Sequence, residues 1–504
     1  MCMFPDRLLS KAIAAAWALA AIEAAAQFDG FALYNLTNQT TARLINANQQ
    51  IAYTWNCPTS FSYAMALKPN GNLVRSAVNV GNQINTAAGS GKVQELNPQG
   101  QVVWEFVYSS ADYITHHDFC LMPNGNVLLL AYARKTLAEL QAAGYTGGSA
   151  KYPGRIIEIQ PNGSTAQIVW QWDMWDRFIQ YADPAKPNYM PIAEHPERMN
   201  INVAISGGGG PGGGIDWFHE NGIDYNEELD QIAFSARHLS EIFIIDHSTT
   251  TAEAAGHTGG NAGRGGDFLF RWGKPANYAV AGPQRIPAAV HDVKWVKGGS
   301  MDGWISFFNN NGGGSSTSTV DAINPDRNGY TYPWTPGTVW GPANYGWRHT
   351  CLAYASGQSS ADIMPNGNVF CAPSGQYLYE VNSGNQVIWQ YNANPQRAFR
   401  YTCDHPGIIN LLNDPCGITT DVPTDEELAA FGMFPNPARE QVNLMGVDVQ
   451  TLRAFVVHDA SGREVKRELP GWTIDVSDLP DGVYTVVLEH GTGERQSRRL
   501  VVAH

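Results

Sequence analysis

The sequence predicts an all-β protein, a six-bladed β-propeller followed by a small C-terminal β-sandwich module. Two repeated patterns and the composition lead to this prediction. Only 15% of the residues are charged, and 51 glycines accompany 15 tryptophans and 21 tyrosines. Such a composition is typical of a β-rich globular protein with many turns, and it argues against a disordered or coiled-coil chain.

The first repeat is a Pro-Asn-Gly turn between two apolar segments, which occurs in near copies at residues 67–73, 121–127 and 363–369. A turn of this composition between apolar residues is a strong signal of a β-hairpin. Pro69 and Pro123 open the first two turns, and the distance between them sets the period of the repeat.

The second repeat is an apolar strand with a central tryptophan, at residues 102–106, 168–172 and 387–391. A Pro-x-Gly or Ser-Gly turn precedes each copy, so one unit contains an inner and an outer hairpin. Four strands of this kind make one propeller blade. Dividing the repeat region, about residues 30–411, by the period gives six or seven units, and we predict six. A β-sandwich is the alternative, but it would not repeat a tryptophan strand at this period.

The chain begins with an expected export signal. Arg7 and Lys11 flank an apolar run at 12–22 that is too short to span a bilayer, and the alanines at 24–26 supply a small-residue cleavage site. A buried alanine-rich helix is the alternative, and no later segment is long and apolar enough for a stable membrane span. The predicted parts are a signal peptide at 1–26, a propeller at 27–415, a linker at 416–430 and a C-terminal module at 431–504.

Net charge bears on the class of partner, and cysteine content bears on disulfides and metal sites. The formal net charge of −14 repels nucleic acid, so no nucleic-acid partner is expected. Six cysteines remain after signal removal, which permits up to three disulfides in an oxidising compartment. Cys403 and Cys416 lie in one loop and are the best candidates for a pair. No C-x-x-C spacing occurs, and no metal site is predicted.

Three predicted hairpins begin with histidine, at His117, His219 and His291. If their first strands are innermost in the blades, these histidines stand at the same end of the central channel. The second strand of an antiparallel hairpin returns to its starting end, which should bring Arg237 near His219 and Arg134 near His117. Imidazoles and a guanidinium in one place could hold an anion and move protons, although a structural hydrogen bond is the alternative for each histidine.

Several segments resemble the bacterial arylsulfate sulfotransferases: DWFHENGIDYN at 216–226, FSAR at 234–237, His291-Asp292, and the turn at 365–368. The loop at 246–257 is similar to that of secreted members, and the likeness covers roughly residues 50–395. The resemblance implies a six-bladed propeller that moves a sulfuryl group from an aryl sulfate to a phenol through a sulfohistidine. No nucleotide or other cofactor is implied.

The resemblance and the register together define a predicted site. Catalytic roles are assigned to three histidines and substrate binding to four other residues: His117, His219 and His291, and Arg237, Asn221, Tyr225 and Asn309. Two features of the family are missing. The segment 308–314 has no arginine, and the strand around 371–379, where the nucleophilic histidine is expected, offers only Gln376. His117, His238 or His349 would have to substitute. The alternative is a non-catalytic propeller that binds sulfated or phenolic ligands at the cell surface.

The last part of the chain resembles the C-terminal sorting domain of the type IX secretion system. The likeness runs from FPNP at 434–437 through LPDGVY at 479–484 to the basic, apolar end at 498–502. It implies passage through the periplasm, the type IX secretion machinery as a partner, and a secreted or cell-surface location. A small β-sandwich used for binding is the alternative.

Overall fold

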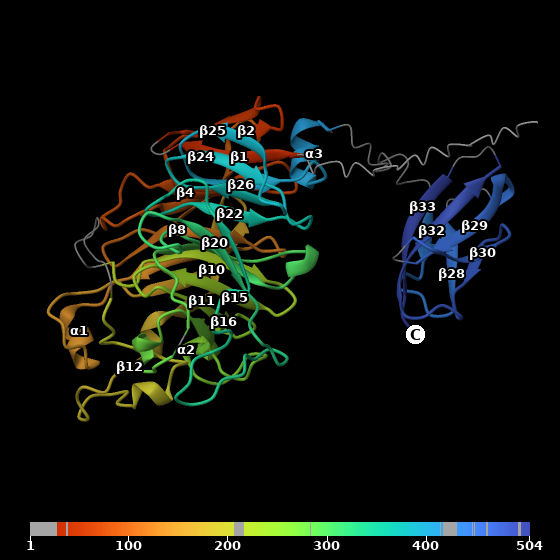
Figure 1. Cartoon of the computed structure of the whole chain (residues 1–504). Helices are drawn as coiled ribbons and strands as arrows, with labels where there is room; N and C mark the ends of the chain where they lie inside the picture. The colour runs from red at the N-terminus through yellow and green to blue at the C-terminus, as the bar shows by residue number, and fades with distance from the viewer. Residues whose placement is uncertain are drawn as a thin grey trace, which may run out of the picture. The chain divides into compact units, whose positions relative to one another are not determined.

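The computed structural model describes residues 28–36, 39–205, 216–282, 284–413, 415–416, 431–445, 447, 449–459, 462–491 and 495–504. The chain forms two compact units, Met1–Cys416 and Gly417–His504 (Figure 1). The expected signal peptide and nearly all of the expected linker lie outside the described residues. No helix in the described part of the chain is long and apolar enough to cross a membrane.

The described part of the first unit contains six four-stranded antiparallel sheets. The first three in chain order are β4 (Phe61–Leu67), β5 (Leu73–Val78), β6 (Gly91–Leu96) and β7 (Val102–Val107); β8 (Tyr113–Leu121), β9 (Val127–Ala133), β10 (Gly154–Asn162) and β11 (Thr165–Asp173); and β14 (Glu220–Asn226), β15 (Gln231–Ala236), β16 (Glu241–Asp246) and β17 (Phe268–Trp272). The next are β18 (Val290–Trp295), β19 (Ile305–Asn309), β20 (Thr319–Ile323) and β21 (Trp347–Thr350); β22 (Ser360–Ile363), β23 (Val369–Ala372), β24 (Tyr377–Val381) and β25 (Val387–Asn392); and β26 (Pro395–Tyr401) with β1 (Phe31–Leu36), β2 (Thr41–Asn46) and β3 (Ile51–Asn56).

Shorter elements lie between and beside these sheets. They are α1 (Leu137–Ala142), α2 (Thr251–Ala255) and α3 (Pro406–Leu412), the parallel pair β12 (Phe178–Ile179) and β13 (Met199–Asn200), and the 3-10 turns η1 (Met174–Arg177), η2 (Ile192–Glu194), η3 (Pro275–Tyr278) and η4 (Gly299–Met301).

The repeated turns take the predicted places. They join β4 to β5, β8 to β9 and β22 to β23, and Gly71, Gly125 and Gly367 occupy their left-handed positions with φ of 83°, 88° and 83°. A glycine adopts this conformation without the steric penalty that a side chain would bring. The tryptophan strands are β7, β11 and β25, each the outermost strand of its sheet. The local hairpin predictions are therefore confirmed.

The six sheets are arranged in a closed ring. Each first strand contacts the first strand of the next sheet, in the order β4, β8, β14, β18, β22, β26 and back to β4. The ring closes because β26, from the C-terminal end of the unit, pairs with β1 from its beginning. The all-β, propeller-like architecture is confirmed, and the assignment of one blade to each sheet is our interpretation.

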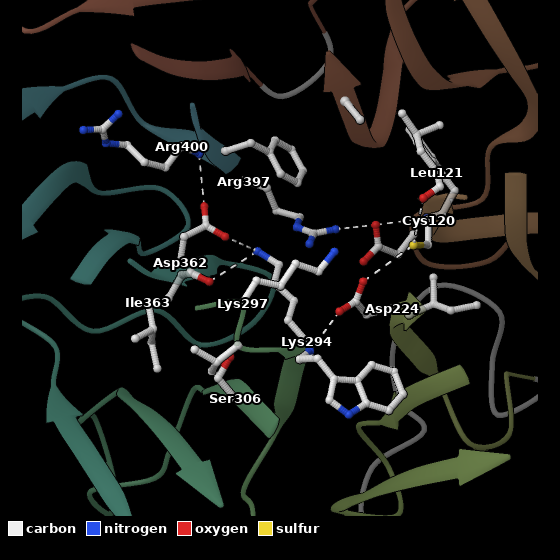
Figure 2. Close-up of a pocket in the computed structure, with 18 of the residues that line it drawn as sticks. Cys120, Leu121, Asp224, Lys294, Lys297, Ser306, Asp362, Ile363, Arg397 and Arg400 are labelled. Atoms are coloured by element: carbon white, nitrogen blue, oxygen red, sulfur yellow. Dashed lines mark hydrogen bonds and ion pairs between the residues drawn. The ribbon is translucent and has the colours of Figure 1, made fainter. Parts of the chain in front are cut away.

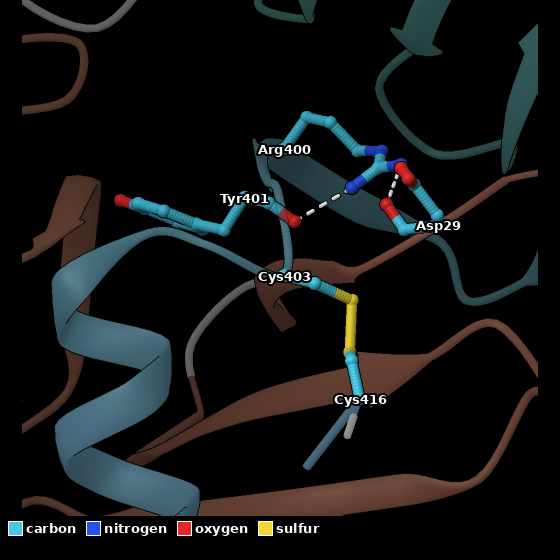
Figure 3. The surroundings of a disulfide bond; sticks show 5 residues. All are labelled: Asp29, Arg400, Tyr401, Cys403 and Cys416. Carbon is cyan, nitrogen blue, oxygen red and sulfur yellow. Dashed lines mark hydrogen bonds and ion pairs between the residues drawn. A yellow bond between two sulfur atoms is a disulfide. The ribbon is translucent and has the colours of Figure 1, made fainter. Parts of the chain in front are cut away.

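A disulfide joins Cys403, which follows β26, to Cys416, with Cα atoms 6.0 Å apart (Figure 3). This pairing was predicted and is confirmed. It ties down the end of the chain segment that closes the ring. The other four described cysteines are free thiols in the structure.

The second unit is built from two sheets with a shared apolar core. One contains β27 (Gly432–Phe434), β28 (Gln441–Met445) and β31 (Thr473–Asp475), the other β30 (Glu464–Glu468), β29 (Leu452–His458), β32 (Gly482–His490) and β33 (Arg495–Val502), with η5 (Val449–Thr451) before β29. Residues of the motifs at 434–437 and 479–484 make hydrogen bonds within this unit. Asn436 bonds the backbone of Arg499 and Val501, and the Tyr484 hydroxyl donates to the Pro480 carbonyl at 2.7 Å.

Candidate functional site

The three predicted catalytic histidines lie at the same end of the ring. His117 is in β8, His219 directly precedes β14, and His291 is in β18. The ring centroids of His117 and His219 are 4.5 Å apart. Burial, and then the neighbouring His219, lower the pKa of His291 well below its ordinary value. The three histidines therefore lie in one cluster, as the strand register predicted.

An unusual backbone directs two of these side chains. His117 and His219 have left-handed conformations, with φ of 48° and 58°. Such a conformation costs a non-glycine residue roughly 1 kcal/mol or more, so the surrounding structure must hold it in place. The pairing of β8 with β9 is interrupted around His117, between Thr115 and Phe119, and that of β14 with β15 just after His219, between Glu220 and Gly222. A bulge changes the direction of a side chain relative to a regular strand.

Asp216 and His219 form a buried pair. Asp216 Oδ2 lies 2.6 Å from His219 Nδ1, and Asp216 Oδ1 accepts the Tyr132 hydroxyl at 2.7 Å. Although burial acts to raise the pKa of Asp216, the hydrogen bond from His219 lowers it to about 2. An ionised Asp216 keeps the proton on Nδ1 and leaves a lone pair on Nε2. Nε2 has no hydrogen-bond partner in the part of the chain that the structure describes.

Further imidazoles surround this pair. The His238 ring lies 4.8 Å from that of His219, and Nδ1 of His116 lies 2.9 Å from Nδ1 of His117. Burial lowers the pKa of His116 to about 3 and that of His117 well below its ordinary value. These imidazoles are neutral at neutral pH, because a buried ring without a carboxylate partner does not hold a second proton.

His291 differs from the others because both its ring nitrogens have partners. Nδ1 donates to the Ala289 carbonyl and to Asn310 Oδ1, at 2.9 and 2.7 Å. Nε2 accepts the backbone N–H of Gln358 at 3.1 Å. In this arrangement His291 holds the loop before β22 and has no lone pair to offer a substrate.

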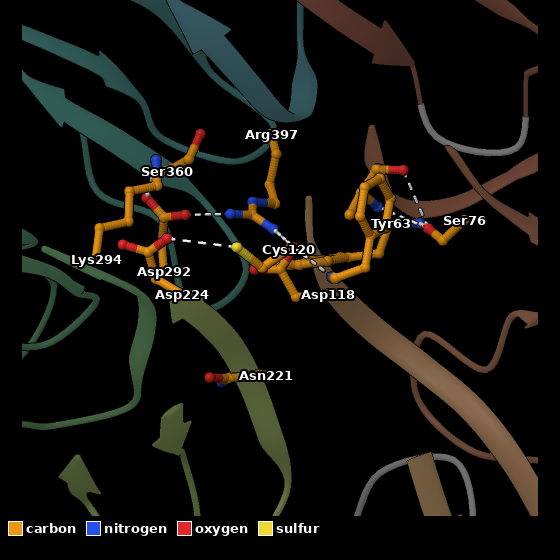
Figure 4. Close-up of polar contacts among 12 residues, drawn as sticks. Tyr63, Ser76, Asp118, Cys120, Asn221, Asp224, Asp292, Lys294, Ser360 and Arg397 are labelled. Carbon is orange, nitrogen blue, oxygen red and sulfur yellow. Dashed lines mark hydrogen bonds and ion pairs between the residues drawn. The ribbon is translucent and has the colours of Figure 1, made fainter. Parts of the chain in front are cut away.

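Two arginines supply positive charge at the cluster. Arg397, on β26, is buried between Asp118 and Asp292, 2.6 Å from Asp118 Oδ1 (Figure 4). Arg237 follows β15, and its backbone N–H donates to the His219 carbonyl at 3.0 Å, as the hairpin geometry predicted. Its guanidinium bonds the Ser356 carbonyl at 3.2 Å, while its buried Nε has no partner among the described residues.

The other predicted binding residues are engaged elsewhere. The Asn221 amide joins the Val290 carbonyl to the Ser235 hydroxyl at 2.8 and 2.7 Å, so it links β14 to its neighbours. Asn309 accepts the Ala288 N–H and donates to Asp321. Tyr225 is a correction to the predicted site. It lies six positions beyond His219 on an extended strand, roughly 20 Å away along the chain, and its hydroxyl donates to Asp230.

Three further expectations are corrected. Arg134 lies beside Asp112 rather than His117. The reason is that β8 already begins at Tyr113, which pairs with Ala133, so the hairpin ends several residues before the histidine. His349 bonds Tyr379 in β24 and Asn385 in the turn that follows β24. Gln376 is exposed in the loop between β23 and β24.

Sequence reasoning missed Asp216, Asn310 and Gln358. The D-x-x-H spacing of Asp216 and His219 is visible in the sequence and could have indicated the pair. Asp216, His219 and His238 are also a group whose ligand atoms lie within 4.8 Å of one another, close enough for a metal ion. The distance of 2.6 Å between Asp216 and His219 is that of a hydrogen bond, which fits a proton-sharing pair.

The fold and the site together define an all-β, propeller-like protein with a buried imidazole cluster on its axis. Residues 52–399 match the family model of the arylsulfotransferases (ASST), more than half of the chain, and the chain belongs to this family. Residues 432–503 match the secretion system C-terminal sorting domain, which indicates export to the cell surface or the extracellular space through type IX secretion. No curated protein matches the chain.

Solved structures with some likeness are distant. A Bacteroides caccae protein of unknown function is 10% identical, with a TM-score of 0.42 over 73% of this chain and 98% of its own. BamB of Moraxella catarrhalis is 10% identical, with a TM-score of 0.30 over 71% and 85%. The periplasmic gluconolactonase PpgL of Pseudomonas aeruginosa is 9% identical, with a TM-score of 0.35 over 94% and 96%.

Proposed function

We propose that the chain transfers a sulfuryl group from an aryl sulfate to a phenol, with His219 as the nucleophile. The hydrogen bond between Asp216 and His219 Nδ1, at 2.6 Å, together with an unpartnered Nε2, carries this proposal. An imidazole whose Nδ1 bonds a carboxylate can present its Nε2 lone pair as a nucleophile. His219 thus takes the role that the sequence leaves open in the strand around 371–379.

The proposed reaction has two halves. His219 Nε2 attacks sulfur, the bond from sulfur to the aryl oxygen breaks, and the phenolate leaves with the electron pair. The acceptor phenol then attacks the same sulfur through its oxygen and loses its proton to water. The S–N bond breaks and its electron pair returns to Nε2. Arg237, with an unpartnered Nε, stabilises charge on the sulfuryl oxygens.

The test uses purified protein with 4-nitrophenyl sulfate and phenol. Release of 4-nitrophenolate is expected, and this leaving group needs no proton, so the assay reports on the first half alone. No release with or without acceptor would contradict the proposal. Activity that persists in EDTA favours the proton-sharing pair, and loss that is restored by a divalent metal favours a metal held by Asp216, His219 and His238.

One observation favours a second function, a non-catalytic propeller that binds sulfated or phenolic ligands. Both ring nitrogens of His291 are engaged, and no arginine occurs in the segment 308–314. Binding of 4-nitrophenyl sulfate that survives both His219→Ala and His291→Ala, without turnover, would support this function over the first.

A further inference from the structure

A cavity of about 320 Å³ lies inside the ring, away from the histidines (Figure 2). It is lined by later residues of the first strands, among them Leu121, Asp224, Trp295, Asp362 and Phe399, and by Lys297, which follows the end of β18. Since all these strands start at the histidine end, residues further along them lie toward the opposite end of the axis. The cavity is within the size range of small-molecule sites.

A buried ionic layer separates this cavity from the imidazole cluster. Arg397 contacts Asp118 and Asp292, each of which directly follows a histidine of the cluster, His117 or His291 (Figure 4). The Arg397 side chain is 1% exposed. A ligand in the cavity therefore meets the far side of this layer and does not touch the imidazoles.

The charges that line the cavity are mostly paired. Lys294 lies 2.7 Å from Asp362 and 3.1 Å from Asp292. Arg400 lies 2.8 Å from Glu380. Among the cations of the lining, Lys297 is exposed and has no ion pair within the described ranges. Figure 2 shows it between Asp362 and Asp224.

Asp224 is the carboxyl that could compensate Lys297, but its oxygens already have partners. Oδ2 accepts the Trp295 backbone N–H at 2.8 Å, and Oδ1 accepts the Cys120 thiol at 3.6 Å. Burial raises the pKa of Asp224, which reduces the negative charge available to Lys297. The remaining walls are apolar and include Leu121, Trp295 and Phe399. A cavity with one positive group and aromatic and aliphatic walls suits a ligand that carries an acid group on an apolar body.

We propose that this cavity is a second ligand site, which binds a small organic anion with an aromatic or branched aliphatic body through Lys297. The ammonium contacts the acid group, and the rings of Trp295 and Phe399 contact the body. This site is separate from the sulfuryl-transfer site and does not depend on that proposed function.

Benzoate is the probe, titrated by calorimetry into the full chain. One site is expected, with acetate and benzyl alcohol each binding at least tenfold more weakly because one lacks the ring and the other the charge. Lys297→Met should weaken benzoate binding at least tenfold, and Lys297→Arg should retain it. His219→Ala should leave it unchanged, since that residue lies beyond the Arg397 layer.

Several outcomes would overturn the proposal: no benzoate binding by the wild-type chain, equal binding by Lys297→Met, or loss of binding in His219→Ala. Lys297 is exposed, so its variants are expected to fold, and circular dichroism checks this for each. A crystal soaked with 4-iodobenzoate provides an independent readout. Its iodine should lie between Trp295 and Phe399, and iodine only at the imidazole cluster would also contradict the proposal.

Discussion

The two units of the chain differ in what they bury. The first unit buries complete arginine side chains, among them Arg75, Arg177, Arg271 and Arg397, together with carboxylates and imidazoles. In the second unit every buried side chain within the described residues is aliphatic or aromatic, as in the core around Phe455 and Leu488. A buried charge is costly unless it is paired and hydrogen-bonded, so the first unit needs a far more specific interior.

The difference shows where each unit can act. Polar groups held away from water in fixed positions are what chemistry requires, and these lie on the axis of the first unit. The second unit has only its surface to offer a partner. Its Leu469 and Trp472 are 85% and 59% exposed. The motif residues Asn436 and Tyr484 are instead engaged in hydrogen bonds within the unit.

The strongest test of this contrast is His219→Ala. If His219 is the nucleophile, release of 4-nitrophenolate should fall by roughly 10⁴-fold or more, to the level of the solvent reaction. Arg134→Ala is the matched control, because Arg134 is exposed and lies beside Asp112. Turnover by the His219 variant close to the wild-type rate would assign the chemistry to another residue.

Asp216→Asn tests the orientation of the nucleophile. An amide no longer fixes the proton on Nδ1, so kcat should fall on the order of 10³-fold while KM changes little. Stopped-flow assays on protein whose circular dichroism is unchanged provide the measurement. A rise in KM with constant kcat would instead mean that Asp216 serves substrate binding.

The fold was largely predictable because its signals are local. A Pro-Asn-Gly turn needs only neighbouring residues, and copies of it fixed the hairpins and their period. The closing pair of β26 and β1 is different. It joins two segments at opposite ends of the unit, and no local pattern marks either as a partner of the other.

The site was predictable only in part. His117, His219 and His291 were brought together by register, which depends on strand period alone. The binding roles of Asn221 and Asn309 stay predictions, since an amide that bonds neighbouring strands looks the same in sequence as one that faces a substrate. Arg397 comes from a distant part of the chain and pairs with Asp118 only in the closed ring.

A smaller effect is expected for Glu220, a buried carboxyl whose oxygens have no hydrogen-bond partner in the described chain. Burial raises the pKa of Glu220 from 4.5 to about 8. The folded state therefore keeps a proton that the unfolded state loses, so this residue's contribution is full below pH 4.5 and is lost as pH rises through about 8. Thermal melts at several pH values should show wild type losing up to about 1.4 kcal/mol per pH unit relative to Glu220→Gln.

The control for that series is Glu228→Gln, at an exposed position in the turn after β14. Its melting temperature should follow that of wild type across the same range. If the melting temperature of the Glu220 variant also follows that of wild type, the Glu220 carboxyl does not hold an extra proton in the folded protein, and the prediction is wrong.

The smallest effect on the purified protein is expected from deleting residues 430–504. The second unit has its own continuous apolar core, which includes Phe455, Ile474, Leu488 and Leu500, so we expect each unit to fold by itself. The truncated chain should show the melting temperature and the 4-nitrophenyl sulfate turnover of the full chain. In cells it should stay in the periplasm, because it has lost the part that the secretion machinery recognises. The full chain with Leu469→Ser and Trp472→Ser tests whether exposed apolar side chains carry that recognition, since the double variant would then also stay in the periplasm. If the truncated protein reaches the medium, this unit is not the sorting signal, and if it unfolds, the two interiors are not independent.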